Sequence, residues 1–504
     1  MNTNYLAKSI AVCATLLWAT PAAAATVTAG PADDVESIIN GLMPGDELVL
    51  ADGTYTLDGS RFGIDIAGTE AMPIVIRSAD GARAHFNRPT DAQNIWDINA
   101  AYVVFRGIEF SGGSAGLRFE AGRFVTVQDC EIHDTGDVAL RMNDGGRYEG
   151  MRILHNEIHH TNGTGEGMYL GCNSNGCQVA NSLIEGNYVH HTNQATVDQG
   201  DGIELKEGSF GNIIRGNVIH DTNYPCILTY STVGNGAANI IENNALWNCG
   251  DHGIQSAADA IIRNNIILGA VADGIAMQPH QAGTPSNLIV VHNTVLNSGT
   301  AISLRGATGT VLIANNALYS ETGEALFTNG STSLLTSVGN VGVGGGVGVA
   351  AGSLTTDFVM ANFGGAPPMN VFPAAGSALV GAGVVVHVTE LDFDYTARAG
   401  VADVGAYAFA SGAPGWVLGE GFKGGIPGPG PSMDGGVPMP TDGGVPPVGT
   451  DGGRPAGDAG VAPVAPDEGG CSCRASAGES GTASSLAGVF VVLLALGAMR
   501  RRRA

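Results

Sequence analysis

An asparagine recurs along most of this chain within the pattern apolar–apolar–x–x–Asn–x–apolar, and this repeat constrains the fold more than any other feature. The asparagines lie 21 to 31 residues apart, and Ile108 and Cys130 occupy the same place in two earlier units. The asparagines are Asn156, Asn187, Asn217, Asn244, Asn265, Asn293 and Asn316. A fixed local pattern at variable spacing is typical of stacked repeats that take loop insertions between their strands.

Each unit contains a short apolar strand, a turn with the asparagine, and a second strand after a glycine-rich turn. In segment 200–221, Ile203 and Leu205 alternate with Glu204 and Lys206, as a strand with one buried face requires. Strands of successive units lie about 4.8 Å apart, so the asparagines would form a ladder of hydrogen-bonded amides. We therefore predict an all-β solenoid of parallel strands, and the 77 glycines suit its many tight turns.

A short amphipathic helix is expected before the first strands. Asp33 or Asp34 can cap it, and apolar residues follow at i, i+3, i+4 and i+7: Val35, Ile38, Ile39 and Leu42. Such a helix would cover the open end of the stack, where strand edges and core are otherwise exposed.

With this repeat and capping helix, the chain resembles the right-handed parallel β-helix superfamily, which includes pectate lyases, over residues 30 to 410. Segments 373–379 and 392–407 look like the last coil common to that superfamily. The resemblance implies a right-handed parallel β-helix over residues 26–411, and it is specific for the fold and not for an activity.

Both ends of the chain carry segments that we interpret as targeting signals. Lys8, an apolar run over 10–18 and small residues up to Ala25 predict a secretory signal over residues 1–25. Residues 412–470 are rich in Pro, Gly and Asp and predict a disordered linker. Residues 471–504 combine two cysteines, a short apolar run and a terminal arginine cluster at 500–503, and are similar to the myxobacterial C-terminal sorting tail. An ordinary single-span anchor is the alternative, and either implies display at the cell surface or outer membrane.

The net charge limits the classes of binding partner, and the cysteines limit the disulfides that the chain can form. A formal charge of −24 argues against nucleic acid as a partner, and many acidic residues make Ca²⁺ sites plausible. In an exported protein we expect Cys172 and Cys177 to form a local disulfide. Cys130, Cys226 and Cys249 cannot be paired from sequence, and buried free thiols are the simplest interpretation. We expect a monomer.

Aligning the second strands of successive units separates core from surface. Leu140, Met168, Ile203, Ile227, Ile254, Ile275 and Ile302 form one inward column, and Met142, Leu170, Leu205, Thr229, Ser256, Met277 and Leu304 the next. One open face is then predicted to carry Arg141, Tyr169, Glu204, Lys206 and Tyr230, with Glu166, Asp201, His252 and Asp273 beside it at the turns.

A face bearing cations, phenols and carboxylates suits an elongated acidic polysaccharide. Eliminative cleavage of a uronate chain needs charge neutralisation at the carboxylate, a base for the α-proton and an acid for the leaving oxygen. We assign Lys206, with a lowered pKa, as the base, Tyr230 as the acid, and Arg141 or Ca²⁺ as the neutralising charge. Glu166 and Asp201 are the candidate Ca²⁺ ligands. The candidate substrate contacts are Glu204, Tyr169, His252, Gln278 and Arg305.

Lys206 with Ser209 and Asn212 is similar to the lysine-serine-asparagine strand of the alginate lyase and chondroitinase B family, in which that lysine is the base. This chain departs from the family at the following coil, where segment 229–231 stands in place of an arginine-histidine pair. Two alternatives stay open. Glu204 and Lys206 can be a solvated pair on a strand, or the face can belong to a non-catalytic adhesin or matrix protein.

A column of histidines follows the asparagine ladder. His133, His159, His190 and His220 share it, with Trp247 at its end, and Asp134, His160, His191 and Asp221 share the neighbouring column. Imidazoles and carboxylates one coil apart could hold Zn²⁺ or another transition metal. The alternative is a row of stacked turn residues that shelter the edge of the core, since no HExxH or paired-cysteine pattern is present.

Overall fold

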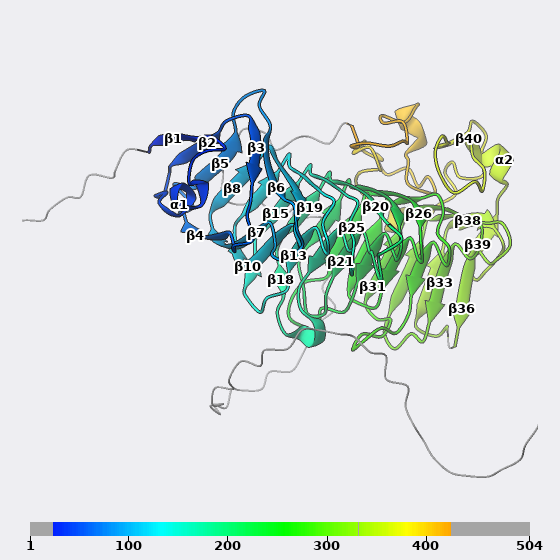
Figure 1. Cartoon of the computed structure of the whole chain (residues 1–504). Coiled ribbons are helices and arrows are strands. Elements are labelled where there is room, and N and C mark those ends of the chain that lie inside the picture. The colour runs from blue at the N-terminus through cyan, green and yellow to red at the C-terminus, as the bar shows by residue number, and fades with distance from the viewer. Residues whose placement is uncertain (1–23, 331, 425–504) are drawn as a thin grey trace, which may run out of the picture. The chain divides into compact units, whose positions relative to one another are not determined.

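The computed structural model of the chain describes residues 24–330 and 332–424, and these residues fold as a parallel β-helix. Three 13-stranded sheets run along the solenoid, and each coil contributes strands to them (Figure 1). The predicted all-β solenoid is therefore confirmed. Residues 1–23 of the predicted signal, 425–470 of the predicted linker and the sorting tail at 471–504 lie outside the described residues.

Sheet A follows the order β1 (Thr26–Ala29), β2 (Glu47–Leu50), β5 (Ile74–Ser78), β8 (Val103–Arg106), β11 (Thr126–Gln128), β15 (Arg152–Leu154), β19 (Leu183–Glu185), β22 (Ile213–Arg215), β25 (Asn239–Glu242), β28 (Ala260–Arg263), β31 (Leu288–Val291), β34 (Val311–Ala314) and β37 (Leu335–Val338). Sheet B follows the order β3 (Gly53–Thr56), β6 (Ala84–Arg88), β9 (Ile108–Gly112), β12 (Glu131–His133), β16 (Glu157–His159), β20 (Tyr188–Thr192), β23 (Val218–Thr222), β26 (Ala245–Cys249), β29 (Ile266–Ile267), β32 (Thr294–Asn297), β35 (Ala317–Ser320), β38 (Asn340–Val343) and β39 (Val349–Ala351).

Sheet C begins with β4 (Gly63–Ala67), β7 (Trp96–Ala101) and β10 (Leu117–Arg123). From β10 it continues through β13 (Leu140–Met142), β17 (Met168–Leu170), β21 (Ile203–Leu205), β24 (Ile227–Thr229), β27 (Ile254–Ser256), β30 (Ile275–Met277), β33 (Ile302–Arg305) and β36 (Leu326–Asn329). The short strands β14 (Tyr148–Glu149) and β18 (Val179–Ala180) extend the other end of β10.

The register of sheet C agrees with the predicted columns. Met168 pairs with Ile203, and Ile203 with Ile227, so the first inward column lies in file and is fully buried. Tyr169 pairs with Glu204 on the other face. Because side chains alternate along a strand, this register determines which side chains, far apart in the sequence, become neighbours on each face of the sheet.

The asparagine ladder is present and longer than predicted. Each Nδ2 donates to the Oδ1 of the next asparagine at 2.9 to 3.0 Å, from Asn156 as far as Asn340. A second, shorter ladder, which was not predicted, joins Asn212 to Asn239. The amides satisfy backbone groups at the bend between sheets A and B, where no strand partner is in reach.

The N-terminal end is covered as predicted. Helix α1 (Val35–Asn40) is capped by Asp34, whose Oδ1 accepts from the Ser37 amide, and it buries Val35 and Ile39. Figure 1 shows α1 at the start of the stack, beside β4. Its apolar face therefore closes the first coil.

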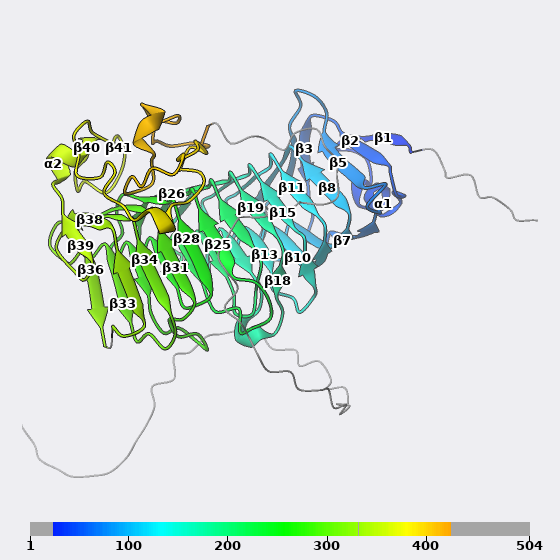
Figure 2. The ribbon, with the colours of Figure 1, turned by 180° about the vertical axis from the view of Figure 1, so that it is seen from behind.

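The C-terminal segment differs from the predicted last coil. After β39 come α2 (Leu354–Asp357) and the antiparallel strands β40 (Phe358–Met360) and β41 (Asn370–Pro373), and then two short 3-10 helices, η2 (Val385–His387) and η3 (Phe409–Ser411). Residues 374–424 add no strand to the three sheets. They fold back along the solenoid beside β26 and β28 (Figure 2). Asn243 donates to the Asp392 carbonyl, and buried Arg398 donates to Asn264.

Packing on the solenoid continues past residue 411, where the sequence analysis places the linker boundary. Lys423 is buried and donates to the carbonyls of Phe393 and Asn243, and Phe422 stacks on His155. Among the described residues, no helix has the length and apolarity to cross a membrane.

Two disulfides are present. Cys172 and Cys177 are bonded as predicted, in the loop around η1 (Asn173–Asn175). Cys226 and Cys249 also form a disulfide, so the interpretation of these two as free thiols was wrong. Cys130 is a buried free thiol. Stacking places Cys226 and Cys249 on adjacent coils, which spacing along the chain does not reveal.

Candidate functional site

Strand β21 positions the central groups of the candidate site. Glu204 points away from the core, and Lys206 follows on the same side. Lys206 Nζ lies 2.5 Å from Glu204 Oε1, and the Tyr230 hydroxyl of the next coil donates to the same oxygen at 2.9 Å. Lys206 Nζ lies 3.4 Å from the Tyr230 oxygen and 4.5 Å from the centre of the Tyr169 ring. The structure thus gathers four of the predicted site residues, Tyr169, Glu204, Lys206 and Tyr230.

Three carboxylates converge next to this group. Glu166 and Asp201 occupy the same turn position of successive coils, since the amide of Gly167 donates to the Asp201 carbonyl. Glu166, Asp201 and Glu204 each place a carboxylate oxygen within 4.8 Å of the others, and all three residues are buried. Both oxygens of Asp201, with Glu166 Oε1 and Glu204 Oε2, have no hydrogen-bond donor among the described residues. Unpaired carboxylate oxygens at this density require either protons or a cation.

The acidities of these groups follow from their burial. Desolvation, with repulsion from Glu204, raises the pKa of Glu166 to about 7. Desolvation together with the charges of Glu204 and Glu166 raises the pKa of Asp201 well above its ordinary value. The cluster therefore competes for protons near neutral pH, as a set of carboxylates poised for a cation would.

Lys206 and Tyr230 both hold their protons firmly in this arrangement. Burial is the largest single influence on Lys206 and lowers its pKa, but the interactions with Glu204 and Tyr169 together outweigh burial and leave that pKa above its ordinary value. The predicted lowering of the Lys206 pKa is thus wrong for the ion-paired state. Desolvation and the neighbouring Glu204 charge raise the pKa of Tyr230, which keeps the phenol protonated.

The face is covered, and the prediction that it is open was wrong. Glu207 accepts from the Ser174 amide and from the Ala282 amide, which ties two loops together over the site. His280, in the second loop, stacks on Tyr230 with ring centres 4.9 Å apart. Lys206, Glu204 and Tyr230 are each less than 5% exposed as a result. A solvated Glu204–Lys206 pair is therefore excluded. The insertions at 161–166 and 192–200 contact each other through Gly163 and Val197.

Arg141 lies outside this cluster. It is in register with Tyr169 on β13, but its guanidinium is 3.4 Å from Asp137 Oδ2 and donates to Asn143 Oδ1 at 3.0 Å. Arg141 is half-buried and stands one coil before Tyr169, so the structure places it along the same row and not in contact with Lys206.

The remaining predicted substrate contacts form a second group further along sheet C. Gln278 Nε2 lies 3.3 Å from His252 Nε2, and Arg305 Nη1 lies 3.5 Å from Gln278 Oε1. Asp273 accepts from Arg305 at 2.7 Å and from Ser303. The position of Asp273 at the turns beside the face was predicted, whereas its ion pair with Arg305 was not. This group forms a polar continuation of the row beyond Tyr230.

Comparisons with known proteins agree with this architecture. Residues 74–199 and 180–318 match a family model described as the right handed beta helix region. The right-handed parallel β-helix fold is thereby established.

A curated relative, "Pectate lyase L" of Dickeya chrysanthemi, is 27% identical over 116 residues, which is 21% of this chain and 27% of that protein. Solved structures with similarity include pectate lyase Pel9A, with 17% identity, TM-score 0.47 and coverage of 76% of this chain and 96% of that chain. An alginate lyase from Paenibacillus sp. str. FPU-7 has 18% identity, TM-score 0.41 and coverage of 62% and 99%.

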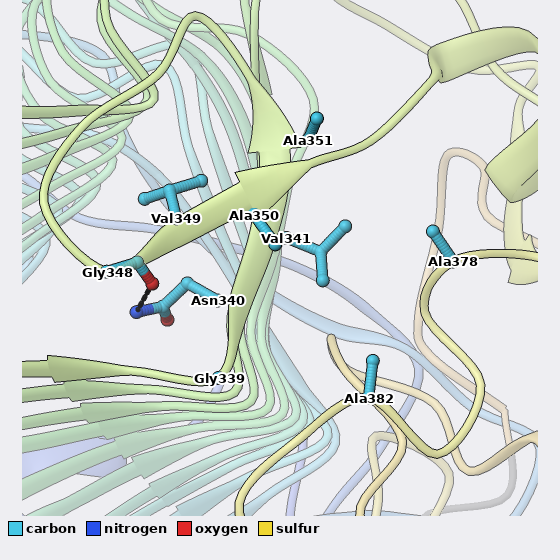
Figure 3. A pocket seen from close by; sticks show the side chains of 9 residues that line it. All are labelled: Gly339, Asn340, Val341, Gly348, Val349, Ala350, Ala351, Ala378 and Ala382. Carbon is cyan, nitrogen blue, oxygen red and sulfur yellow. Dashed lines mark hydrogen bonds between the residues drawn. The ribbon is translucent and has the colours of Figure 1, made fainter.

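Sequence reasoning missed two residues of this β-helix site. His280 and Glu207 lie in or against loops, and neither belongs to a repeating column. Glu207 follows Lys206 directly, yet only the loop fold shows that its two oxygens serve different loops. A third feature, a pocket of about 380 Å³ lined by residues 339–341, 348–351, 378 and 382, lies at the C-terminal coils (Figure 3). Its lining carries no ionisable side chain, so it offers no acid or base.

Proposed function

We propose that this protein is a carbohydrate-active β-helix that cleaves a uronate-containing polysaccharide by β-elimination. One observation carries the proposal: three buried carboxylates with four unpaired oxygens adjoin a lysine and a tyrosine on the outer face of sheet C. Carboxylate oxygens in this number are the ligands that Ca²⁺ takes in proteins, so Glu166, Asp201 and Glu204 fit a Ca²⁺ site.

A Ca²⁺ held by Glu166, Asp201 and Glu204 would supply positive charge that offsets most of the charge of these carboxylates and attracts the uronate carboxylate. With the charge of Glu204 offset, burial would favour the neutral form of Lys206. Neutral Lys206 takes the α-proton of the uronate, the bond to the glycosidic oxygen breaks and a carbon–carbon double bond forms. Tyr230, protonated and 3.4 Å from Lys206 Nζ, donates the proton that the leaving oxygen requires.

The substrate must reach groups that the two loops cover. The loops at 172–177 and 279–283 are joined through Glu207, so we propose that they separate when polysaccharide binds. The group of His252, Gln278 and Arg305 lies in the same row and would bind neighbouring sugar carboxylates and hydroxyls, with Arg141 at the other end.

A non-catalytic adhesin or matrix protein is the second candidate. The mutual hydrogen bonds of Glu204, Lys206 and Tyr230 favour it, because a satisfied and buried triad can also be a structural element. For both candidates we propose export through residues 1–25 and retention at the cell surface or outer membrane through residues 471–504.

Absorbance of unsaturated product on pectate, alginate and glycosaminoglycans, with Ca²⁺ or with a chelator, separates the candidates. We expect Lys206→Ala and Tyr230→Phe each to lower the cleavage rate at least about 100-fold, the lower range for losing an acid or base. Tyr102→Phe is the matched control, because Tyr102 lies between β7 and β8, stacks on Phe124 and belongs neither to the carboxylate cluster nor to the row of Lys206. Far-UV circular dichroism checks folding. Absence of product on every uronate polymer, with binding retained, would support the adhesin.

A further inference from the structure

A ladder of histidines on sheet B takes no part in the proposed cleavage. His133, His159, His190 and His220 stack on one another with ring centres 4.8 to 5.4 Å apart, and His220 stacks on Trp247 at 4.6 Å. The predicted column is thus confirmed. Stacked rings that only cover the edge of the core would show the same spacing. The hydrogen-bond partners of the ring nitrogens therefore distinguish a structural row from a metal-binding site.

His159 and His190 are the two inner rings of the ladder, and one nitrogen of each faces a carboxylate of the preceding coil. His159 Nε2 lies 3.2 Å from Glu131 Oε1, and His190 Nε2 lies 3.3 Å from Glu157 Oε1. Arg83 contacts Glu131 and also Glu109, so these carboxylates already have a cation partner. Glu157, among the side chains that the structure describes, has an ion pair with His190 alone.

The other nitrogen of each inner ring meets a second histidine. His160 and His191 have left-handed φ angles of 55° and 54°, which turn their side chains back toward the preceding residue. His159 Nδ1 lies 2.6 Å from His160 Nδ1, and His190 Nδ1 lies 2.7 Å from His191 Nδ1. The rings of His160 and His191 stack 5.0 Å apart, so the two pairs lie side by side.

The hydrogen-bond pattern fixes which nitrogens carry free lone pairs. A neutral His159 that donates from Nε2 to Glu131 has an unprotonated Nδ1, and the same holds for His190 and Glu157. Each Nδ1 pair then shares one proton, supplied by the outer ring. A metal ion can replace such a proton, which is released to solvent on binding.

We propose that His159, His160, His190 and His191 bind a divalent transition-metal ion of the Zn²⁺ class through their Nδ1 atoms, with Glu157 as the outer partner that orients His190. Imidazole nitrogens suit Zn²⁺, Cu²⁺ and Ni²⁺, whereas Ca²⁺ prefers oxygen ligands. Glu131 and Glu157 accept Nε2–H from His159 and His190, and they orient these rings as the outer partners of metal-bound histidines do. The side chain of Glu157 is 35% exposed and that of His190 10% exposed, so an ion can enter from solvent.

This site is separate from the carboxylate cluster. The histidines lie on β16 and β20 of sheet B and directly after β16, whereas Glu166, Asp201 and Glu204 lie on sheet C and its turns. We therefore expect the histidines, with nitrogen ligands, to select Zn²⁺ and the carboxylates, with oxygen ligands, to select Ca²⁺. Ca²⁺ should not displace Zn²⁺ from the histidines.

Calorimetric titration of chelator-stripped full-length protein with Zn²⁺ tests the proposal. We expect binding with proton release, detected as a dependence of the heat on the ionisation enthalpy of the buffer. The double variant His159→Gln/His190→Gln should weaken Zn²⁺ binding at least about 10-fold, the lower range for a lost metal contact. His387→Gln, in η2 and outside the ladder, should leave the titration unchanged.

A stripped protein that takes up no Zn²⁺, or a double variant that binds Zn²⁺ like the wild type, would overturn the proposal. Glu157→Gln is a second variant that keeps the size and position of a partly exposed side chain, so weaker binding there cannot reflect a lost core. X-ray absorption at the zinc edge must then show imidazole scattering. A shell of oxygens only would refute the assignment to these histidines.

Discussion

Replacing Glu166 by Gln isolates the electrostatic character of the carboxylate cluster. The side chain is fully buried, and Glu166 Oε2 accepts from the Thr164 hydroxyl at 2.7 Å while Oε1 has no donor among the described residues. Gln keeps the shape and an acceptor for Thr164, and it places an N–H group among the unpaired oxygens of Asp201. We expect this variant to be more stable than wild type without Ca²⁺, in a manner that depends on pH.

The magnitude follows from the raised pKa of Glu166. Moving a carboxyl pKa from 4.5 to about 7 corresponds to roughly 3 kcal/mol, at 1.36 kcal/mol per pKa unit. A carboxyl group with a raised pKa binds its proton more tightly in the folded state, so folding costs nothing extra below pH 4.5. The cost grows between pH 4.5 and 7 and is complete above pH 7. The advantage of Glu166→Gln should therefore be near zero at pH 4.5 and roughly 3 kcal/mol at pH 8.

Urea unfolding at pH 4.5 and pH 8, in chelator and in millimolar Ca²⁺, measures the difference in the free energy of unfolding between Glu166→Gln and the wild type. Glu70→Gln is the control, since Glu70 is exposed on a turn. Ca²⁺ at pH 8 should stabilise the wild type more than Glu166→Gln, because binding to the folded state alone raises its stability. An equal free-energy difference at pH 4.5 and pH 8 would show that Glu166 is not held protonated by its surroundings, and would refute the reasoning.

Two further predictions concern the scaffold. Asn217→Ala removes the acceptor of the Asn187 amide, at 2.9 Å, within the ladder. A buried N–H without a partner costs about 1–3 kcal/mol, so urea unfolding should show a decrease of that size in the free energy of unfolding. The control Asn99→Ala, on the exposed face of β7, should leave the free energy of unfolding almost unchanged. Breaking the Cys226–Cys249 disulfide by a double Ser variant should lower the unfolding free energy by about 3 kcal/mol, from the sequence separation of 23. An unchanged denaturation midpoint in either variant contradicts the corresponding role.

The repeat pattern was sufficient to predict the parallel β-solenoid, its inward columns and the asparagine ladder. Each of these depends on a residue type recurring at one place in every coil, and stacking at a fixed spacing converts that recurrence into contacts. The local disulfide of Cys172 and Cys177 and the cap at Asp34 were also predictable, because their partners are close in sequence. The fold-back of residues 374–424 was not, since that segment has no repeat to align.

For the candidate site, the sequence by itself determined which groups share a row: Tyr169, Glu204 and Lys206 alternate with core residues whose register is unambiguous. Only the tertiary structure decided whether that row is open. Loops that differ in length between coils carry Glu207 and His280, and they bury Lys206 against Glu204. Burial lowers the pKa of Lys206, but the interactions with Glu204 and Tyr169, which are stronger where water is excluded, together raise it above its ordinary value. Periodicity thus specifies position along the solenoid, whereas solvent exclusion, which sets acidity, depends on the non-repeating loops.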